Sequence, residues 1–80
     1  MMSRTETINT LQVLIREVLE NPSLKITEES GSHNVEGWTS LNHVILISEI
    51  EQKFNIAFSL DDLLSISNVG DICQIIENQK

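Results

Sequence analysis

The chain has 80 residues, enough for one small domain (1–80) and too few for a deep cleft between two lobes. It is 40% hydrophobic but has only one Trp, two Phe and no Tyr, so we expect an aliphatic core. Its net charge is −7, all of it carried by residues 28–80. This charge excludes nucleic acid and anionic membranes as favourable partners, and it attracts basic protein surfaces. Alternatively, the acidity only keeps a small protein soluble.

The single cysteine, Cys73, excludes an internal disulfide, and nothing suggests a secreted scaffold. No secretory signal opens the chain. The longest unbroken aliphatic run, Val44–Ile47, is far too short to span a bilayer. We therefore expect a cytoplasmic protein.

Hydrophobic residues recur at helical spacing from Ile8 to Leu19, which predicts a first helix of about three turns. Pro22 ends it, because proline disfavours helix in the residue before it and cannot continue one. Residues 21–38 lack a regular period and have the composition of a loop, which is long for a compact domain. Three apolar side chains are expected to attach this loop to the bundle: Leu24, Ile26 and Val35.

A second helix is predicted from Thr39 or Ser40 to about Phe54. Ser59 and Asn68 have the character of N-caps, so each should open a further helix, the first of them short. Alternation of period two is nowhere sustained over the length of a strand. The sequence therefore predicts an all-α fold, a bundle of three long helices and one short one with a long loop between the first and second.

The segment before the second helix carries the most chemical information. Gly37 allows the backbone to turn sharply, Thr39 can cap the helix, and Ser40 then occupies its first position. A phosphate ester on Ser40 would be favoured by free backbone N–H groups and by the positive end of the helix dipole. The alternative is that Thr39 and Ser40 simply end a loop.

Four motifs follow one another in an order and spacing that resemble the acyl carrier protein family over nearly the whole chain. Thr39-Ser40-Leu41 stands where the family has Asp-Ser-Leu at the start of its second helix. The other three motifs resemble the rest of that helix, the short third helix and the start of the fourth: 46–56, 58–63 and 69–72.

The resemblance implies a four-helix, acyl-carrier-type bundle that is a monomer and not an enzyme. A phosphopantetheinyl transferase would attach phosphopantetheine from coenzyme A to Ser40, with Thr39 and Leu41 beside it. The thiol of this arm would carry acyl or aminoacyl groups as thioesters, and partner enzymes with basic surfaces would load and remove them. No general base is evident beside Ser40, which also fits a carrier better than a hydrolase. The nature of the cargo stays open.

Thr39 departs from the family, which has an aspartate there. Threonine is a competent N-cap, so the helix should still start, but the lost carboxylate could weaken recognition of Ser40 by the transferase. The alternative function is therefore an unmodified, acidic helical module on the same fold that binds a basic partner.

The early part of the second helix is also less acidic than in the family, since Asn42 and Ile45 occupy positions that are often acidic. We expect Leu41 and Ile45 to make apolar contacts with partners, and Glu49 and Glu51 to supply charge pairing. For Ile45 an ordinary core position is the alternative.

The remaining candidates have simpler interpretations. Trp38 should anchor the loop on the bundle, with a role in shielding or positioning the arm as the alternative. His33 and His43 lack further ligands at suitable spacing, so no metal site is expected. His43 is either a hydrogen-bonded boundary residue or a contact of the arm, and Cys73 should be a small buried hydrophobe.

Overall fold

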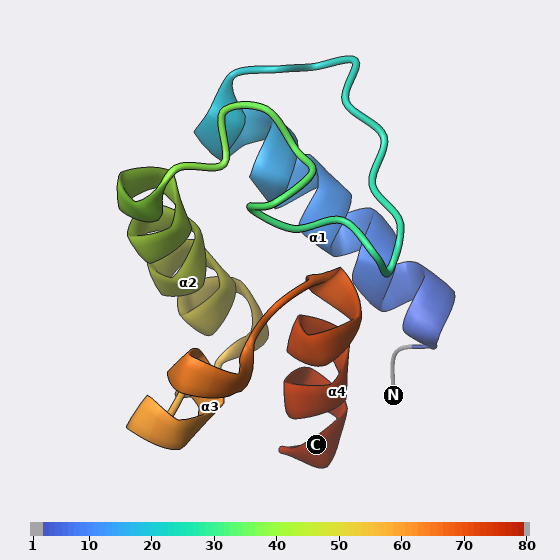
Figure 1. Ribbon diagram of the computed structural model, residues 1–80. Helices are drawn as coiled ribbons and strands as arrows, with labels where there is room; N and C mark the ends of the chain where they lie inside the picture. Colours follow the sequence, from blue (N-terminus) through green and yellow to red (C-terminus); the bar gives the residue numbers. More distant parts are fainter. Residues whose placement is uncertain (1–2, 80) are drawn as a thin grey trace.

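The computed structural model describes residues 3–79, and all regular secondary structure in this range is helical (Figure 1). The helices are α1 (Arg4–Leu19), α2 (Ser40–Phe54), α3 (Leu60–Ser65) and α4 (Val69–Asn78). Helix α3 has 6 residues, whereas α1 has 16, α2 has 15 and α4 has 10. The predicted all-α bundle with three long helices, one short helix and a long first loop is confirmed.

The start of every helix is fixed by a polar side chain that precedes it. In each case a side-chain oxygen of the N-cap residue accepts a hydrogen bond from the backbone amide three residues further on. The four caps are Ser3, Thr39, Ser59 and Asn68. Such caps satisfy amides that have no partner inside the helix. The three caps predicted from the sequence, Thr39, Ser59 and Asn68, are therefore confirmed.

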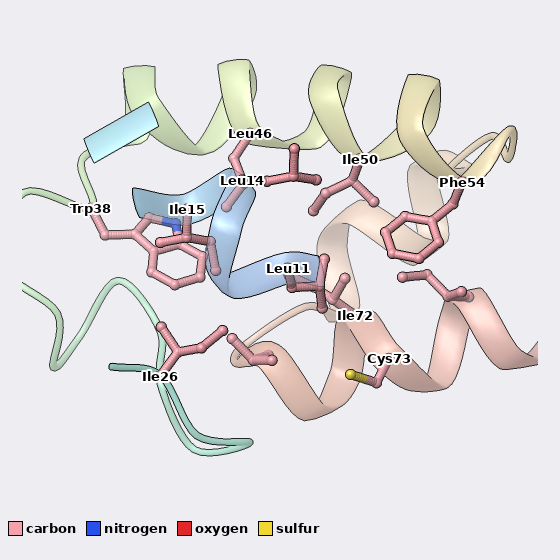
Figure 2. Packing of buried hydrophobic residues seen from close by; sticks show 12 residues of the cluster. Leu11, Leu14, Ile15, Ile26, Trp38, Leu46, Ile50, Phe54, Ile72 and Cys73 are labelled. Carbon is pink, nitrogen blue, oxygen red and sulfur yellow. The ribbon is translucent and has the colours of Figure 1, made fainter. Parts of the chain in front are cut away.

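The core is built from aliphatic side chains of α1, α2 and α4 (Figure 2). Helix α1 contacts both α2 and α4 and so lies against the two other long helices. Seven side chains of the cluster are fully buried, from these three helices: Leu11, Ile15, Leu46, Ile50, Val69, Ile72 and Cys73. Cys73 is buried in the same cluster, as the sequence predicted. One continuous core therefore joins the three long helices.

The loop between α1 and α2 is held against the bundle by both side chains and backbone. Ile26 is buried and Leu24 and Val35 pack against the core, which confirms the predicted attachment. Backbone hydrogen bonds of 2.8 Å join the amides of Val69 and Gly70, at the start of α4, to the loop carbonyls of residues 30 and 28. Because its backbone is bonded to α4, the loop has a defined path, and it delivers the chain to the start of α2.

Helix α2 has a buried face and an exposed face. Leu46, Ile47, Ile50 and Phe54 are buried, as expected from their spacing. Ile45 has 43% of its surface exposed, so the alternative of an ordinary core position for Ile45 is wrong. It lies on the solvent side because it is about half a turn from the buried residues.

Ile50→Ala and Ile45→Ala form a matched pair on one helix, with native exposures of 0% and 43%. Ile50→Ala should lower the free energy of unfolding by about 2–5 kcal/mol, because it leaves a cavity in the core. Ile45→Ala should lower it by less than about 1 kcal/mol, because its site is open to water. Urea denaturation followed by circular dichroism measures both, and equal losses would contradict this assignment of the two faces.

Candidate functional site

Ser40 is the first residue of α2, and its side chain is exposed. The preceding Thr39 is the N-cap, with an extended backbone (φ −81°, ψ 171°) and an Oγ1 atom that accepts from the Asn42 amide at 3.1 Å. Gly37 has a φ of +89°, and its carbonyl accepts from Asn42 Nδ2 at 2.8 Å. Only glycine adopts this conformation without strain, so Gly37 makes the predicted sharp turn. The turn and the cap together present the Ser40 hydroxyl to solvent.

The start of α2 is electrostatically suited to a phosphate ester. The amides of Ser40 and Leu41 have no hydrogen-bond partner among residues 3–79. The first turn of α2 contains no acidic residue, so no carboxylate of this turn repels an anion there. Free amides and the positive end of the helix dipole both favour negative charge at this point. The residues around Ser40 therefore fit a phosphodiester on its hydroxyl.

Trp38 and His43 form a pair beside Ser40 that the sequence did not predict. Trp38 Nε1 donates a hydrogen bond to His43 Nδ1 at 3.0 Å, and the two rings are stacked with centroids 6.1 Å apart. Since Nδ1 accepts, His43 is neutral and its proton is on Nε2. Burial lowers the pKa of His43, which also favours the neutral form. Trp38 is 4% exposed and belongs to the core cluster, so its predicted role as the anchor of the loop is confirmed (Figure 2).

A surface hollow of about 560 Å³ opens next to these residues. It is formed by the end of the long loop, the first turns of α2 and the segment between α3 and α4. The residues that line it are Ser32, Trp38, Thr39, Ser40, His43, Val44 and Ile66. The sequence identified the middle of this set, but not Ser32, Val44 or Ile66. Ser32 and Ile66 come from segments far from Ser40 in the sequence. Val44 belongs to the aliphatic run 44–47, which gave no sign of a site in the sequence.

The residues proposed for partner recognition occupy different environments. Leu41 is 70% exposed, and Ile45 and Glu49 also lie on the solvent side of α2. Glu51 is half-buried, and its Oε2 atom accepts from the Phe58 amide at 2.8 Å. One oxygen of Glu51 thus links α2 to the segment before α3. Further exposed leucines, missed by the sequence analysis, are on α3: Leu60, Leu63 and Leu64.

Cys73 is not among the residues that line the hollow beside Ser40. Cys73 is fully buried, and burial raises the pKa of its thiol to about 11. Little thiolate then exists at neutral pH, so Cys73 is a poor nucleophile. Among residues 3–79, no three His, Cys, Asp or Glu side chains gather as a metal site would require. None of the helices in this range is long and apolar enough to cross a membrane.

A small helical bundle that exposes one serine at a helix start, next to a hollow, is the arrangement of a carrier for a covalently attached group. The sequence profile of the family described as "Phosphopantetheine attachment site" matches residues 9–76. The acyl carrier protein of Helicobacter pylori strain J99 is 36% identical over 70 residues, covering 88% of this chain and 90% of that protein. The acyl carrier protein of Thermotoga maritima is 34% identical over 79 residues, covering 99% of this chain and 98% of that protein.

Solved structures show the same similarity. The solution structure of a holo acyl carrier protein from Geobacter metallireducens superposes with a TM-score of 0.83 at 30% identity, covering 90% of this chain and 83% of that one. A protein of Mycobacterium tuberculosis described as a putative acyl carrier protein gives 0.82 at 27% identity, covering 92% and 99%.

The chain therefore belongs to the acyl carrier protein family. Its prosthetic group is covalently attached phosphopantetheine, and its role is to carry cargo rather than to catalyse. A phosphopantetheinyl transferase and biosynthetic enzymes are the interaction partners of such carriers.

The hydrogen bond between Trp38 and His43 should depend on pH. Because the folded pKa of His43 is lowered, the stability that its neutral form contributes is present above its unfolded pKa of about 6.5 and is lost as pH falls through the folded value. We expect the His43 ring to titrate below pH 6.5 in NMR spectra, and the Trp38 indole N–H resonance to move with the same midpoint. His33→Asn should leave both unchanged. An indole resonance that ignores the titration of His43 would contradict the pairing.

Proposed function

We propose that Ser40 is the residue that bears phosphopantetheine, and that the chain delivers acyl or aminoacyl groups to biosynthetic enzymes. The observation that carries this proposal is the exposed Ser40 hydroxyl at the uncovered, positive end of α2. When bound, the group supplies a thiol that holds cargo as a thioester. A phosphodiester to Ser40 Oγ joins it to the protein.

The residues around Ser40 have separate tasks in this function. Thr39 caps α2 and so keeps Ser40 at the start of the helix. The free amides of Ser40 and Leu41 offset the charge of the phosphodiester. Cys73 is the single cysteine of the chain and is buried, so no reactive protein thiol competes with the arm for the thioester.

We further propose that enzymes with basic surfaces contact the exposed side of α2 near Ser40. Leu41 and Ile45 offer apolar surface within about one and a half turns of the serine, and both are exposed. Glu49 is exposed and available for charge pairing with a basic partner. In Glu51 one carboxylate oxygen already accepts from the Phe58 amide, so only the other oxygen is available for such pairing. We expect the chain to work as a monomeric, cytoplasmic carrier domain.

The attachment residue is tested by intact-mass spectrometry after incubation with coenzyme A and a broad-specificity phosphopantetheinyl transferase. The native chain should gain one phosphopantetheinyl group, because the Ser40 hydroxyl is accessible. Ser40→Ala should gain none. Ser48→Ala, which removes another exposed serine of α2, should gain as much as the native chain.

Absence of a mass gain in the native chain, repeated with several transferases, would instead favour the unmodified interaction module. Thr39→Asp separates the two cases further, since aspartate also caps a helix and restores the carboxylate of the family motif. If only Thr39→Asp is modified, Thr39 controls recognition by the transferase.

The partner surface is tested with the same transferase by steady-state kinetics. Leu41→Ala and Ile45→Ala should each lower kcat/KM by roughly 5- to 30-fold, the effect of about 1–2 kcal/mol of lost contact. Val13→Ala on α1, where the native side chain is 53% exposed, is the matched control and should change nothing. Unchanged kinetics for Leu41→Ala and Ile45→Ala would show that the transferase does not use this face.

A further inference from the structure

The turn that leads into α2 is held by hydrogen bonds, and not by packing, at Gly37. This glycine is exposed, and the space where a side chain would stand is open, with no atom of a non-adjacent residue within 4 Å. Glycine has many backbone conformations open to it besides the observed φ of +89°. The Gly37 carbonyl accepts two hydrogen bonds, from the Thr39 amide at 2.9 Å and from Asn42 Nδ2 at 2.8 Å. These bonds therefore define where the turn lies.

Asn42 bonds to both ends of the segment 37–39. Its backbone amide donates to Thr39 Oγ1 at 3.1 Å, while its side chain donates to the Gly37 carbonyl. Because Asn42 is in the first turn of α2, its backbone is already fixed, and closing the second bond orders only a short side chain. Ser40 lies inside the ring of residues 37–42 that these bonds close. Asn42 thus ties the backbone before Ser40 to the backbone after it.

The amide of Asn42 cannot be replaced by a carboxylate in this role. An ionised aspartate has only acceptors, so it cannot donate to the Gly37 carbonyl and would place negative charge beside that oxygen. The neutral amide also leaves the first turn of α2, which carries Ser40, without an acidic residue. In the sequence Asn42 was only a departure from an often acidic position. In the folded chain it makes a bond that an acidic residue does not make.

We propose that Asn42 is a positioning residue for the transfer of phosphopantetheine to Ser40, because it holds the turn 37–39 and with it the direction of the Ser40 hydroxyl. In this reaction Ser40 Oγ attacks the β-phosphorus of coenzyme A, and the bond from that phosphorus to the bridging oxygen breaks. Adenosine 3′,5′-bisphosphate leaves, and the hydroxyl proton passes to a base of the transferase. The rate of such a displacement depends on the alignment of the attacking oxygen. This inference rests on the proposed attachment at Ser40.

The bond is tested by NMR spectroscopy on the unmodified chain. A scalar coupling across the hydrogen bond should join Asn42 Nδ2 to the Gly37 carbonyl carbon. In Asn42→Ala the backbone order parameter of Gly37 should fall toward the values below about 0.6 that are typical of flexible backbone. Gln52→Ala, which removes an exposed amide further along α2, should leave it unchanged. A native order parameter of Gly37 in Asn42→Ala overturns the proposal.

The positioning role is tested by single-turnover transfer from coenzyme A with the transferase in excess. Asn42→Ala and Asn42→Asp should each lower the maximal rate constant by roughly 5- to 50-fold, because both lose the donor. For Asn42→Ala the half-saturating transferase concentration should change by less than about threefold, since alignment rather than binding is lost. Gln52→Ala should match the native chain in both quantities. Circular dichroism confirms that each variant keeps the native helix content.

The outcomes separate this inference from the attachment itself. A loss confined to the half-saturating concentration would make Asn42 a binding contact and overturn its positioning role. A native maximal rate constant in Asn42→Asp would show that the donated bond is not needed, which also overturns it. In both cases the attachment at Ser40 stands. A native chain that gains no phosphopantetheine overturns the attachment and the role of Asn42 together.

Discussion

The packing of α1 against both α2 and α4 is the constraint on which the rest of the molecule depends. A chain of 80 residues buries a limited core, and here that core is a single aliphatic cluster shared by the three long helices. Because Leu46, Ile47, Ile50 and Phe54 commit one side of α2 to this cluster, the opposite side is left in water. The rotation of α2 about its axis is therefore set by core packing, and with it the directions of Ser40, Leu41 and Ile45.

The long loop connects the core to the site, because its last part is packed in the core and leads directly into α2. Trp38 is buried in the same core and lies two residues before Ser40, so the start of α2 is fixed by tertiary contact as well as by the Thr39 cap. His43, at the end of the first turn of α2, accepts a hydrogen bond from the indole N–H of Trp38. The hollow is lined by this pair and by Ile66 from the segment between α3 and α4. A bulky aromatic residue near the serine thus serves the core and the site together.

A carrier of thioesters must not expose a reactive nucleophile of its own near the arm. The buried Cys73, with its raised pKa, meets this requirement, because a thiolate at the surface would attack a thioester. Residues 28–80 carry the whole net charge of −7, and such a charge attracts basic surfaces. Beside Ser40, Leu41 and Ile45 expose apolar surface on the solvent side of α2.

The four helices, three of their four caps and the place of Ser40 could be predicted from the sequence, because periodicity, capping and turn chemistry act over a few neighbouring residues. The sequence also predicted that Trp38 anchors the loop. Three features could be seen only once the chain was folded: the exposure of Ile45, the hydrogen bond from the Phe58 amide to Glu51 and the hydrogen bond from Trp38 to His43. Each of these depends on how α2 is rotated against its neighbours and where the loops meet it. Ile66 joins the hollow for the same reason, since contacts between distant segments are set by packing and leave no local pattern in the chain.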